Sequence, residues 1–288
     1  MRIRRSIYLC LLLPLLALGA CSKLAKIEKS NDVGKKLAYA NELYAKKKYN
    51  QAQQLYQELL QIYKGTKQAE GLLYNYAYSS YYLKDYEQAA FHFKNFVEVF
   101  PNSPKAIEMD YMQAYCYYML SPRVELDQAN TMKAISAMQT FINTHPDAEK
   151  VQEATHIIDL CRKKLEKKEE NAATLYYDLG YYRAAGITFK NLMRDYPDSE
   201  SGDRYKLMAI KSYYKYAENS ILEKQKERYD QVITEYLDFT DHYANSSYAQ
   251  EAEKYYTSAQ HNLKTVAAQT AKMLKYQQNE QAKEKPEQ

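Results

Sequence analysis

A short pattern of aromatic and small residues recurs along the chain and constrains its fold more than any other feature. Three stretches align without gaps, at residues 49–63, 86–100 and 182–196. Each begins with tyrosine, has alanine three positions later, and has large apolar or aromatic residues seven, ten and fourteen positions after its start. These offsets follow one face of an α-helix, whereas a strand would alternate every second residue. The three stretches are therefore predicted to form equivalent helices.

Two weaker copies, at 131–146 and 229–243, and a second pattern complete the repeat. Each of the five stretches is preceded by an alanine with a tyrosine four residues later, which is again a helical spacing. This alanine lies nine residues before the next stretch in the first, second and fourth repeats, but 17 and 20 residues before it in the third and fifth. We predict five helix-turn-helix units, with longer internal loops in units three and five. The small residues expected where paired helices approach closely are Ala40, Ala52, Ala77, Ala89, Ala114, Ala173, Ala185 and Ala209.

A single hairpin cannot bury its apolar face, so successive hairpins are expected to stack into a solenoid. The chain has only seven glycines and seven prolines, which argues against a turn-rich β fold. The predicted fold class is all-α: a superhelical solenoid of five repeats, resembling the tetratricopeptide repeat, with a capping helix at its C-terminal end. A bundle of unrelated hairpins is the alternative. The predicted domain covers 34–276, with repeats at about 34–65, 68–101, 104–146, 148–197 and 203–245 and the capping helix at 247–276.

The N-terminal residues predict export and lipid anchoring. Three arginines within the first five residues precede an apolar run over 7–18, which is shorter than the ~20 residues that a membrane-spanning helix needs. The run ends in Leu-Gly-Ala-Cys, a lipobox, so 1–20 is predicted to be a signal peptide and Cys21 to be lipidated. An ordinary signal peptide that happens to contain cysteine is the alternative. Ser22 favours the outer membrane, and we expect the anchored protein to face the periplasm. Residues 21–33 are predicted to be a flexible tether, and 277–288 a disordered tail.

The remaining sequence gives no sign of catalysis. The five histidines lack the paired spacing of a metal site, and no phosphate-binding loop or nucleophile motif is present. The net charge of +4 is small, and no basic face is interleaved with aromatic residues, so nucleic acid is not an expected partner. Cys116 and Cys161 are expected to be inert core thiols, with a disulfide between them as the alternative. We expect the protein to have no enzymatic activity, no cofactor and no metal site.

Tyrosine is the most unusual part of the composition, with 32 residues and no tryptophan. The tyrosine that follows each close-contact alanine would lie near the concave wall of a solenoid, and repeats two and three add more rings. Tyrosine combines large contact area with a polar tip, which suits a groove for an extended peptide. Core filling is the alternative. The candidate groove residues are Tyr44, Tyr74, Tyr78, Tyr81, Tyr82, Tyr111, Tyr115 and Tyr118, and the ladder continues to Tyr177 and Tyr213.

From Cys21 to about Tyr276, the lipobox, the short tether and the five repeats together resemble the BamD family, lipoprotein subunits of the outer-membrane β-barrel assembly machinery. The resemblance implies a scaffold that binds the POTRA domains of a BamA-like barrel protein, mainly through its C-terminal repeats. It also implies that the N-terminal repeats receive the C-terminal signals of unfolded outer-membrane proteins. Two alternatives stay open: a repeat lipoprotein that scaffolds cell-wall synthesis or nutrient transport, and a glycan-binding lipoprotein of the SusD type.

Overall fold

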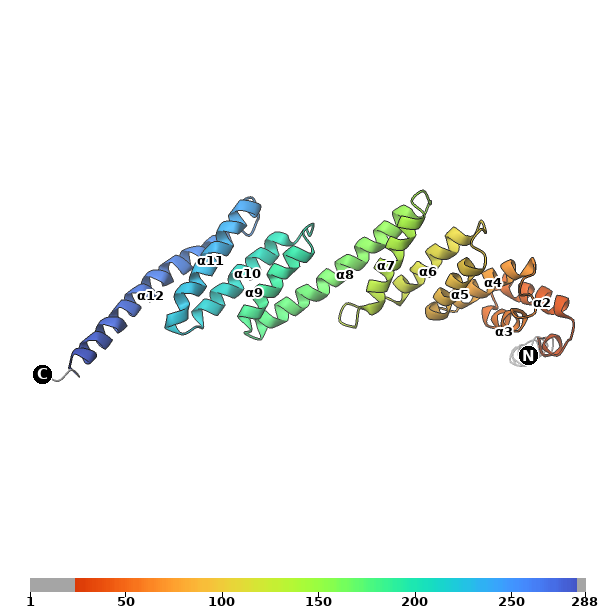
Figure 1. Cartoon of the computed structure of the whole chain (residues 1–288), viewed down its shortest axis with the longest axis horizontal. Coiled ribbons are helices and arrows are strands. Elements are labelled where there is room, and N and C mark those ends of the chain that lie inside the picture. The colour runs from red at the N-terminus through yellow and green to blue at the C-terminus, as the bar shows by residue number, and fades with distance from the viewer. Residues whose placement is uncertain (1–23, 284–288) are drawn as a thin grey trace, which may run out of the picture. The chain divides into compact units, whose positions relative to one another are not determined.

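The computed structural model describes residues 24–283, and all regular structure in this part of the chain is α-helical (Figure 1). The first helices of the five hairpins are α2 (Val33–Ala45), α4 (Gln68–Tyr82), α6 (Ala106–Leu120), α8 (Val151–Asp178) and α10 (Gly202–Glu218). Their partners are α3 (Tyr49–Leu59), α5 (Tyr86–Val99), α7 (Ala129–Thr144), α9 (Tyr182–Asp195) and α11 (Leu222–Tyr243), and α12 (Ala249–Lys283) follows. The predicted all-α, tetratricopeptide-like solenoid is confirmed. None of the helices between residues 24 and 283 is long and apolar enough to cross a membrane.

One type of turn explains the constant spacing in repeats one, two and four. Lys47, Lys84 and Gly180 each follow the first helix of a hairpin with a positive φ, of 57°, 63° and 80°. The next residue donates its backbone N–H to a carbonyl five residues back, for example Lys48 to Leu43 at 2.9 Å. This 6→1 bond is the Schellman arrangement, which satisfies a carbonyl left open at the helix end. A turn of fixed length therefore sets the nine-residue interval.

Proline ends the second helix in three hairpins, as predicted. Helices α5, α7 and α9 each end two residues before a proline, at Pro101, Pro146 and Pro197. Proline has no N–H to donate and disfavours helical backbone in the residue before it. Helix α3 lacks a following proline and ends at Leu59, four residues earlier than its aligned stretch, before a turn in which Gly65 has φ of 78°.

The longer loop predicted for repeat three is confirmed, and the one predicted for repeat five is wrong. In repeat three, Gln128 is buried beneath the loop that joins α6 to α7, and its side-chain amide donates to the carbonyls of Arg123 and Leu126 at 2.8 and 2.9 Å. In repeat five only 219–221 separate α10 from α11. The extra residues, 222–228, are mostly good helix formers without glycine or proline, so they lengthen α11 instead.

Both predicted ends of the repeat domain need correction. Residues 24–28 form a helical turn, and Leu24 and Ile27 pack against the first core cluster, so the predicted tether over 21–33 is ordered from residue 24. At the other end α12 continues to Lys283, past the predicted limit at Tyr276. The polar residues from 277 onward favour helix, and the first proline is Pro286. The signal peptide, Cys21 and residues 284–288 lie outside the described residues.

The chain divides into two compact units, one ending at Arg162 and the other beginning at Lys163, within α8. The predicted single domain over 34–276 did not include this division. Its physical reason is the sequence of α8 at 162–169, where Leu165 is the one apolar residue among charged neighbours. Such a stretch offers little apolar surface for a helix to pack against.

The alanines at the helix contacts are buried throughout. All eight alanines expected at close contacts have at most 1% of their surface exposed. Aromatic residues fill the space around them, so that Ala77 and Ala89 share a cluster with Phe93 and Phe96, and Ala173 and Ala209 lie with Phe189 and Tyr205. Small side chains bring the helix axes together, and aromatic rings of the same hairpin and of the next one complete the core.

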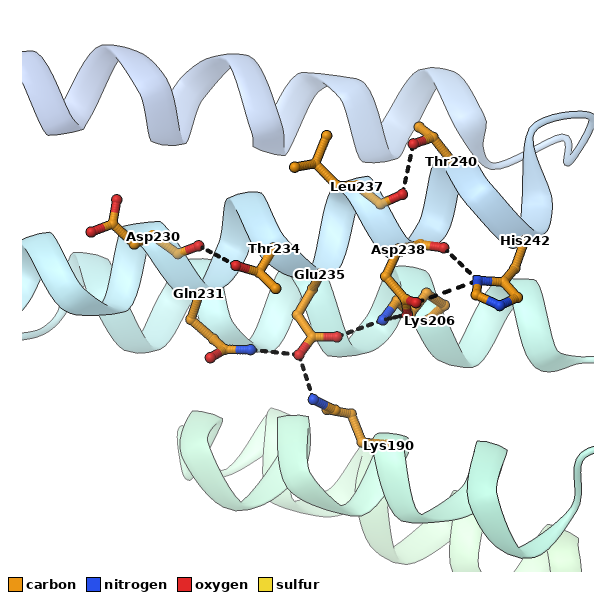
Figure 2. A network of polar contacts seen from close by, with 10 residues as sticks. All are labelled: Lys190, Lys206, Asp230, Gln231, Thr234, Glu235, Leu237, Asp238, Thr240 and His242. Atoms are coloured by element: carbon orange, nitrogen blue, oxygen red, sulfur yellow. Dashed lines mark hydrogen bonds and ion pairs between the residues drawn. The ribbon is translucent and has the colours of Figure 1, made fainter.

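The second unit also contains a buried ionic network that joins three helices (Figure 2). Glu235 of α11 and Lys206 of α10 each have only 3% of their side chain exposed, and their charged atoms lie 2.5 Å apart. Lys190 of α9 reaches the same carboxylate at 2.6 Å, and Gln231 donates to it at 2.6 Å. Lys206 also pairs with Asp238. The network therefore satisfies two charges that the fold has removed from water.

Neighbouring alanines in α8 test the packing register. Ala173 is fully buried, whereas Ala172 is exposed. We expect Ala173→Leu to lower the free energy of unfolding by ~1–3 kcal/mol, because extra methylenes overpack the contact. Ala172→Leu serves as the control and should change stability by less than ~0.5 kcal/mol. Urea unfolding of the two variants measures the difference, and equal effects would contradict the register.

The pH dependence of stability tests the ionic network. Burial opposes ionisation of Glu235, but hydrogen bonds from Lys190 and Lys206 outweigh it and hold the pKa of this carboxyl below its usual value. The unfolded glutamate has a pKa of about 4.3, so the stabilisation is present above that pH and is lost as the pH falls through the lower, folded-state pKa. We expect Glu235→Gln to destabilise the protein by about 3 kcal/mol at pH 7.

The difference between Glu235→Gln and the wild type should shrink in acid, because protonation of Glu235 in the unfolded wild type lowers the free energy of unfolding. Urea unfolding at pH 7 and at pH 3 measures this change. A difference of the same size at both pH values would show that the carboxylate charge does not stabilise the fold.

Candidate peptide-binding site

Helices α4 and α6 bring the predicted tyrosines together in the first unit. Tyr74, Tyr78 and Tyr82 follow one another at intervals of four residues on α4, and Tyr111, Tyr115 and Tyr118 follow at four and three on α6. Side chains at these intervals share one face of a helix. The two rows therefore form an aromatic surface across two neighbouring hairpins.

An open hollow of about 480 Å³ lies on this surface. Four of the predicted groove residues line it: Tyr78, Tyr81, Tyr111 and Tyr115. The residues that complete the lining come from α6, from the turn before α8 and from α8 itself: Ile107, Glu108, Met112, Ala148, Glu149, Lys150 and Glu153. The hollow is thus an aromatic depression with charged side chains on its rim.

All eight predicted groove tyrosines belong to one network of ring contacts. Tyr78 contacts Tyr74, Tyr81 and Tyr82, with ring centroids 4.8, 6.2 and 5.8 Å apart. Tyr82 extends the network to Tyr44 at 6.4 Å. Tyr81 extends it to Tyr115 at 6.4 Å, and Tyr115 lies within 6 Å of Tyr111 and Tyr118. The eight rings that the sequence pattern grouped therefore lie together in the structure. Tyr49, which is stacked on Tyr82 at 4.6 Å, also belongs to the network and was not among the predicted residues.

Burial divides the rings between core and surface. Tyr78 and Tyr111 are buried, Tyr82 is exposed, and the other candidates are half-buried. Tyr78 and Tyr111 therefore fill the core, and the groove stays a prediction for the exposed and half-buried rings. Tyr177 and Tyr213 belong to the second unit. There Tyr213 packs so closely on Gly186 that an added Cβ would lie 2.9 Å from its ring.

Carboxylates that the sequence analysis did not single out control the polar chemistry of the hollow. Glu108 accepts hydrogen bonds from the hydroxyls of Tyr74, at 3.2 Å, and Tyr78. Burial and then the Glu108 carboxylate raise the pKa of Tyr78 far above its usual value. Glu108 stands three residues before Tyr111 on the same helix, so its position on the tyrosine face was readable from the sequence.

The start of α8 contributes an ion pair to the rim. The Lys150 ammonium lies 2.7 Å from Glu153 and 5.5 Å from the centre of the Tyr111 ring. The hydrogen bond from Lys150 lowers the pKa of Glu153. Within residues 24–281, the hydroxyl of Tyr111 is the only buried side-chain N or O atom without a hydrogen-bond partner. Burial and then the nearby Glu153 carboxylate raise the pKa of Tyr111.

The other candidate residues form no reactive site. Cys116 and Cys161 are both buried, in different core clusters, and no disulfide joins them. Burial raises the pKa of the Cys116 thiol to about 12, which keeps it protonated and unreactive. Among the described residues, no group of three or more histidine, cysteine, aspartate or glutamate side chains is placed to hold a metal ion.

Two tyrosine-to-phenylalanine variants in the hollow are expected to behave differently. Tyr78→Phe removes a hydrogen bond to a carboxylate and should lower the free energy of unfolding by about 1.5 kcal/mol. Tyr111→Phe removes a buried hydroxyl that makes no hydrogen bond of ordinary geometry and that interacts with the Glu153 carboxylate, so stability should fall by less than in Tyr78→Phe. Urea unfolding measures both. A loss in Tyr111→Phe as large as that in Tyr78→Phe would mean that its hydroxyl is paired in the folded protein.

The chain matches one family model and is similar to several solved structures of repeat proteins. The family model described as "YfiO: Outer membrane lipoprotein" matches residues 32–228, from the N-cap of α2 into α11. No curated protein matches the chain. Among solved structures, the chain is similar to the complex of the TPR2AB domain of yeast Sti1 with pHSP90, at 15% identity and a TM-score of 0.36, over 79% of this chain and 98% of that one. It is also similar to a putative kinesin light chain of Podosopora anserina, at 9% identity and a TM-score of 0.30, over 70% and 94% of the two chains.

Proposed function

Because this chain belongs to the YfiO family of outer membrane lipoproteins, we propose that it is a scaffold subunit of the machinery that assembles β-barrel proteins in that membrane. In this role it binds the POTRA domains of a BamA-like barrel protein. It also binds the C-terminal signals of unfolded outer-membrane proteins before they fold and insert. The proposal assigns no catalytic step to the chain.

The observation that carries the proposal is the aromatic hollow in the first unit. Tyr78 and Tyr111 form its buried floor, and the half-buried rings of Tyr81 and Tyr115 leave apolar surface for an extended segment. Tyrosine gives much contact area for little loss of side-chain entropy, and an unfolded chain passing through the periplasm exposes aromatic residues that need such surface. A site of this kind binds by shape and stacking, so it accepts many related sequences.

A second surface suits a folded partner. Around the turn from α8 to α9, large apolar side chains are exposed by 43–62%: Leu175, Leu179, Tyr181 and Ile187, with Tyr176 at 41%. A shallow hollow of about 400 Å³ lies here, lined by Tyr181, Ile187 and Tyr216 among others. Soluble surfaces rarely gather so many apolar side chains unless another protein covers them. We assign this surface, in the second unit, to the POTRA domains.

The anchor completes the proposed arrangement. Lipidation at Cys21 would hold the mature chain on the membrane, because each buried methylene of an acyl chain contributes ~0.8 kcal/mol and several chains act together. The repeats would then lie in the periplasm, next to the proteins they receive.

Affinity purification tests the function. We expect the tagged, lipidated protein, purified from detergent-solubilised envelopes, to bring down a POTRA-containing barrel protein in near-stoichiometric amount, identified by mass spectrometry. Leu179→Glu combined with Tyr181→Glu should lower that recovery at least tenfold, because charges then replace the apolar contact. Since both residues are exposed, thermal stability should not change.

The matched controls use the same preparation. Glu98→Gln alters an exposed carboxylate on α5 and should leave recovery unchanged. Cys21→Ala should move the protein from the membrane fraction to the soluble fraction. Recovery of cell-wall enzymes or a nutrient transporter in place of the barrel protein would move the function to the alternative, a repeat lipoprotein of another envelope complex.

A further inference from the structure

The hollow in the first unit has an electrostatic character that its aromatic lining does not reveal. Three carboxylates stand on its rim, Glu108, Glu149 and Glu153, against the single ammonium of Lys150. That ammonium lies 2.7 Å from Glu153, and three carboxylates against one ammonium give the lining a net charge of −2. The rim is therefore negative around a floor of tyrosine rings.

Two features at the start of α8 could favour a carboxylate ligand, and both already interact with Glu153. The first is Lys150, which is paired with Glu153. The second is the N-terminus of α8, whose backbone dipole attracts anions. Glu153 lies in the first turn of α8 and already places a negative charge at that dipole. An incoming carboxylate would thus meet occupied cationic groups and additional negative charge.

A cation fits the same surroundings well. The faces of tyrosine rings attract an ammonium or a guanidinium within ~6 Å, and the structure shows this behaviour beside the hollow, where Lys105 lies 4.2 Å from the centre of the Tyr74 ring. The carboxylates on the rim would add charge-assisted hydrogen bonds. The guanidinium group of arginine matches this site best, because it stacks on aromatic rings and donates several hydrogen bonds in one plane.

We propose that this hollow recognises an arginine or lysine side chain flanked by aromatic residues within an extended segment, and not the free carboxylate at a chain end. The proposal rests on the peptide-binding function assigned above and names the class of segment that the site takes. An unfolded segment would then be held by an internal basic residue, with its terminal carboxylate outside the hollow.

Fluorescence anisotropy with four labelled peptides tests the proposal on the full lipidated protein in detergent. The parent peptide is twelve residues long, with a central arginine between two phenylalanines. Its variants carry glutamine in place of arginine, an amidated C-terminus, or both changes. We expect the change from arginine to glutamine to weaken binding about tenfold and amidation to alter it less than twofold.

The protein side is tested by combining Glu149→Gln with Glu153→Gln, with Glu98→Gln as the matched control away from the hollow. The double variant should lose the preference for arginine, and the control should keep it. Circular dichroism of each variant checks folding, and the wild-type comparison of peptides does not depend on the variants.

The outcomes separate this inference from the proposed function. Binding that survives the arginine replacement but is abolished by amidation would overturn the inference while keeping a peptide site. Failure of all four peptides to bind would overturn both the inference and the assignment of a peptide site to this hollow. Recovery of the barrel protein in the affinity purification would be unaffected by either result.

Discussion

The close approach of two helices at a buried alanine is the contact on which each hairpin depends. A methyl group lets the helix backbones come together, but it contributes little apolar area of its own. That area comes from larger residues nearby, and in this chain tyrosines supply part of it beside phenylalanine, leucine and methionine. A tyrosine ring reaches from the contact toward the surface, with its apolar body packed and its hydroxyl near water. The half-buried rings of α4 and α6 thus follow from the alanines beneath them.

The sequence predicted the register well because period and turn length are local properties. Offsets of three, seven, ten and fourteen define a helical face, and the nine-residue interval reflects a turn closed by Lys47, Lys84 or Gly180 in the left-handed region. The errors arose where nothing local ends a helix. The start of α11 and the end of α12 lack glycine and proline, so the helices run further than the repeat pattern implies.

The candidate site was only half predictable, for a physical reason. The tyrosines share a helix face and could be grouped by spacing alone. The carboxylates of Glu149 and Glu153 reach the hollow from the next hairpin, because α8 begins beside α6, and this tertiary placement has no sequence period. The buried pair of Lys206 and Glu235 was equally hidden. On a helical wheel they are ordinary charged residues, and only the stacking of α9, α10 and α11 removes them from water. Their hydrogen bonds restrict how those three helices can slide, since few registers satisfy both charges.

The ring network of the first unit also has an optical consequence. The chain contains no tryptophan, so its ultraviolet emission comes from tyrosine alone. Rings separated by 4.6–6.4 Å pass excitation energy to one another efficiently, and Tyr44 through Tyr118 therefore behave as one coupled set of chromophores. A segment carrying a single indole, once seated against Tyr81 or Tyr115, would collect that energy and emit at longer wavelength. Because the protein has no tryptophan emission of its own, binding of a tryptophan-containing segment could be followed directly by that emission.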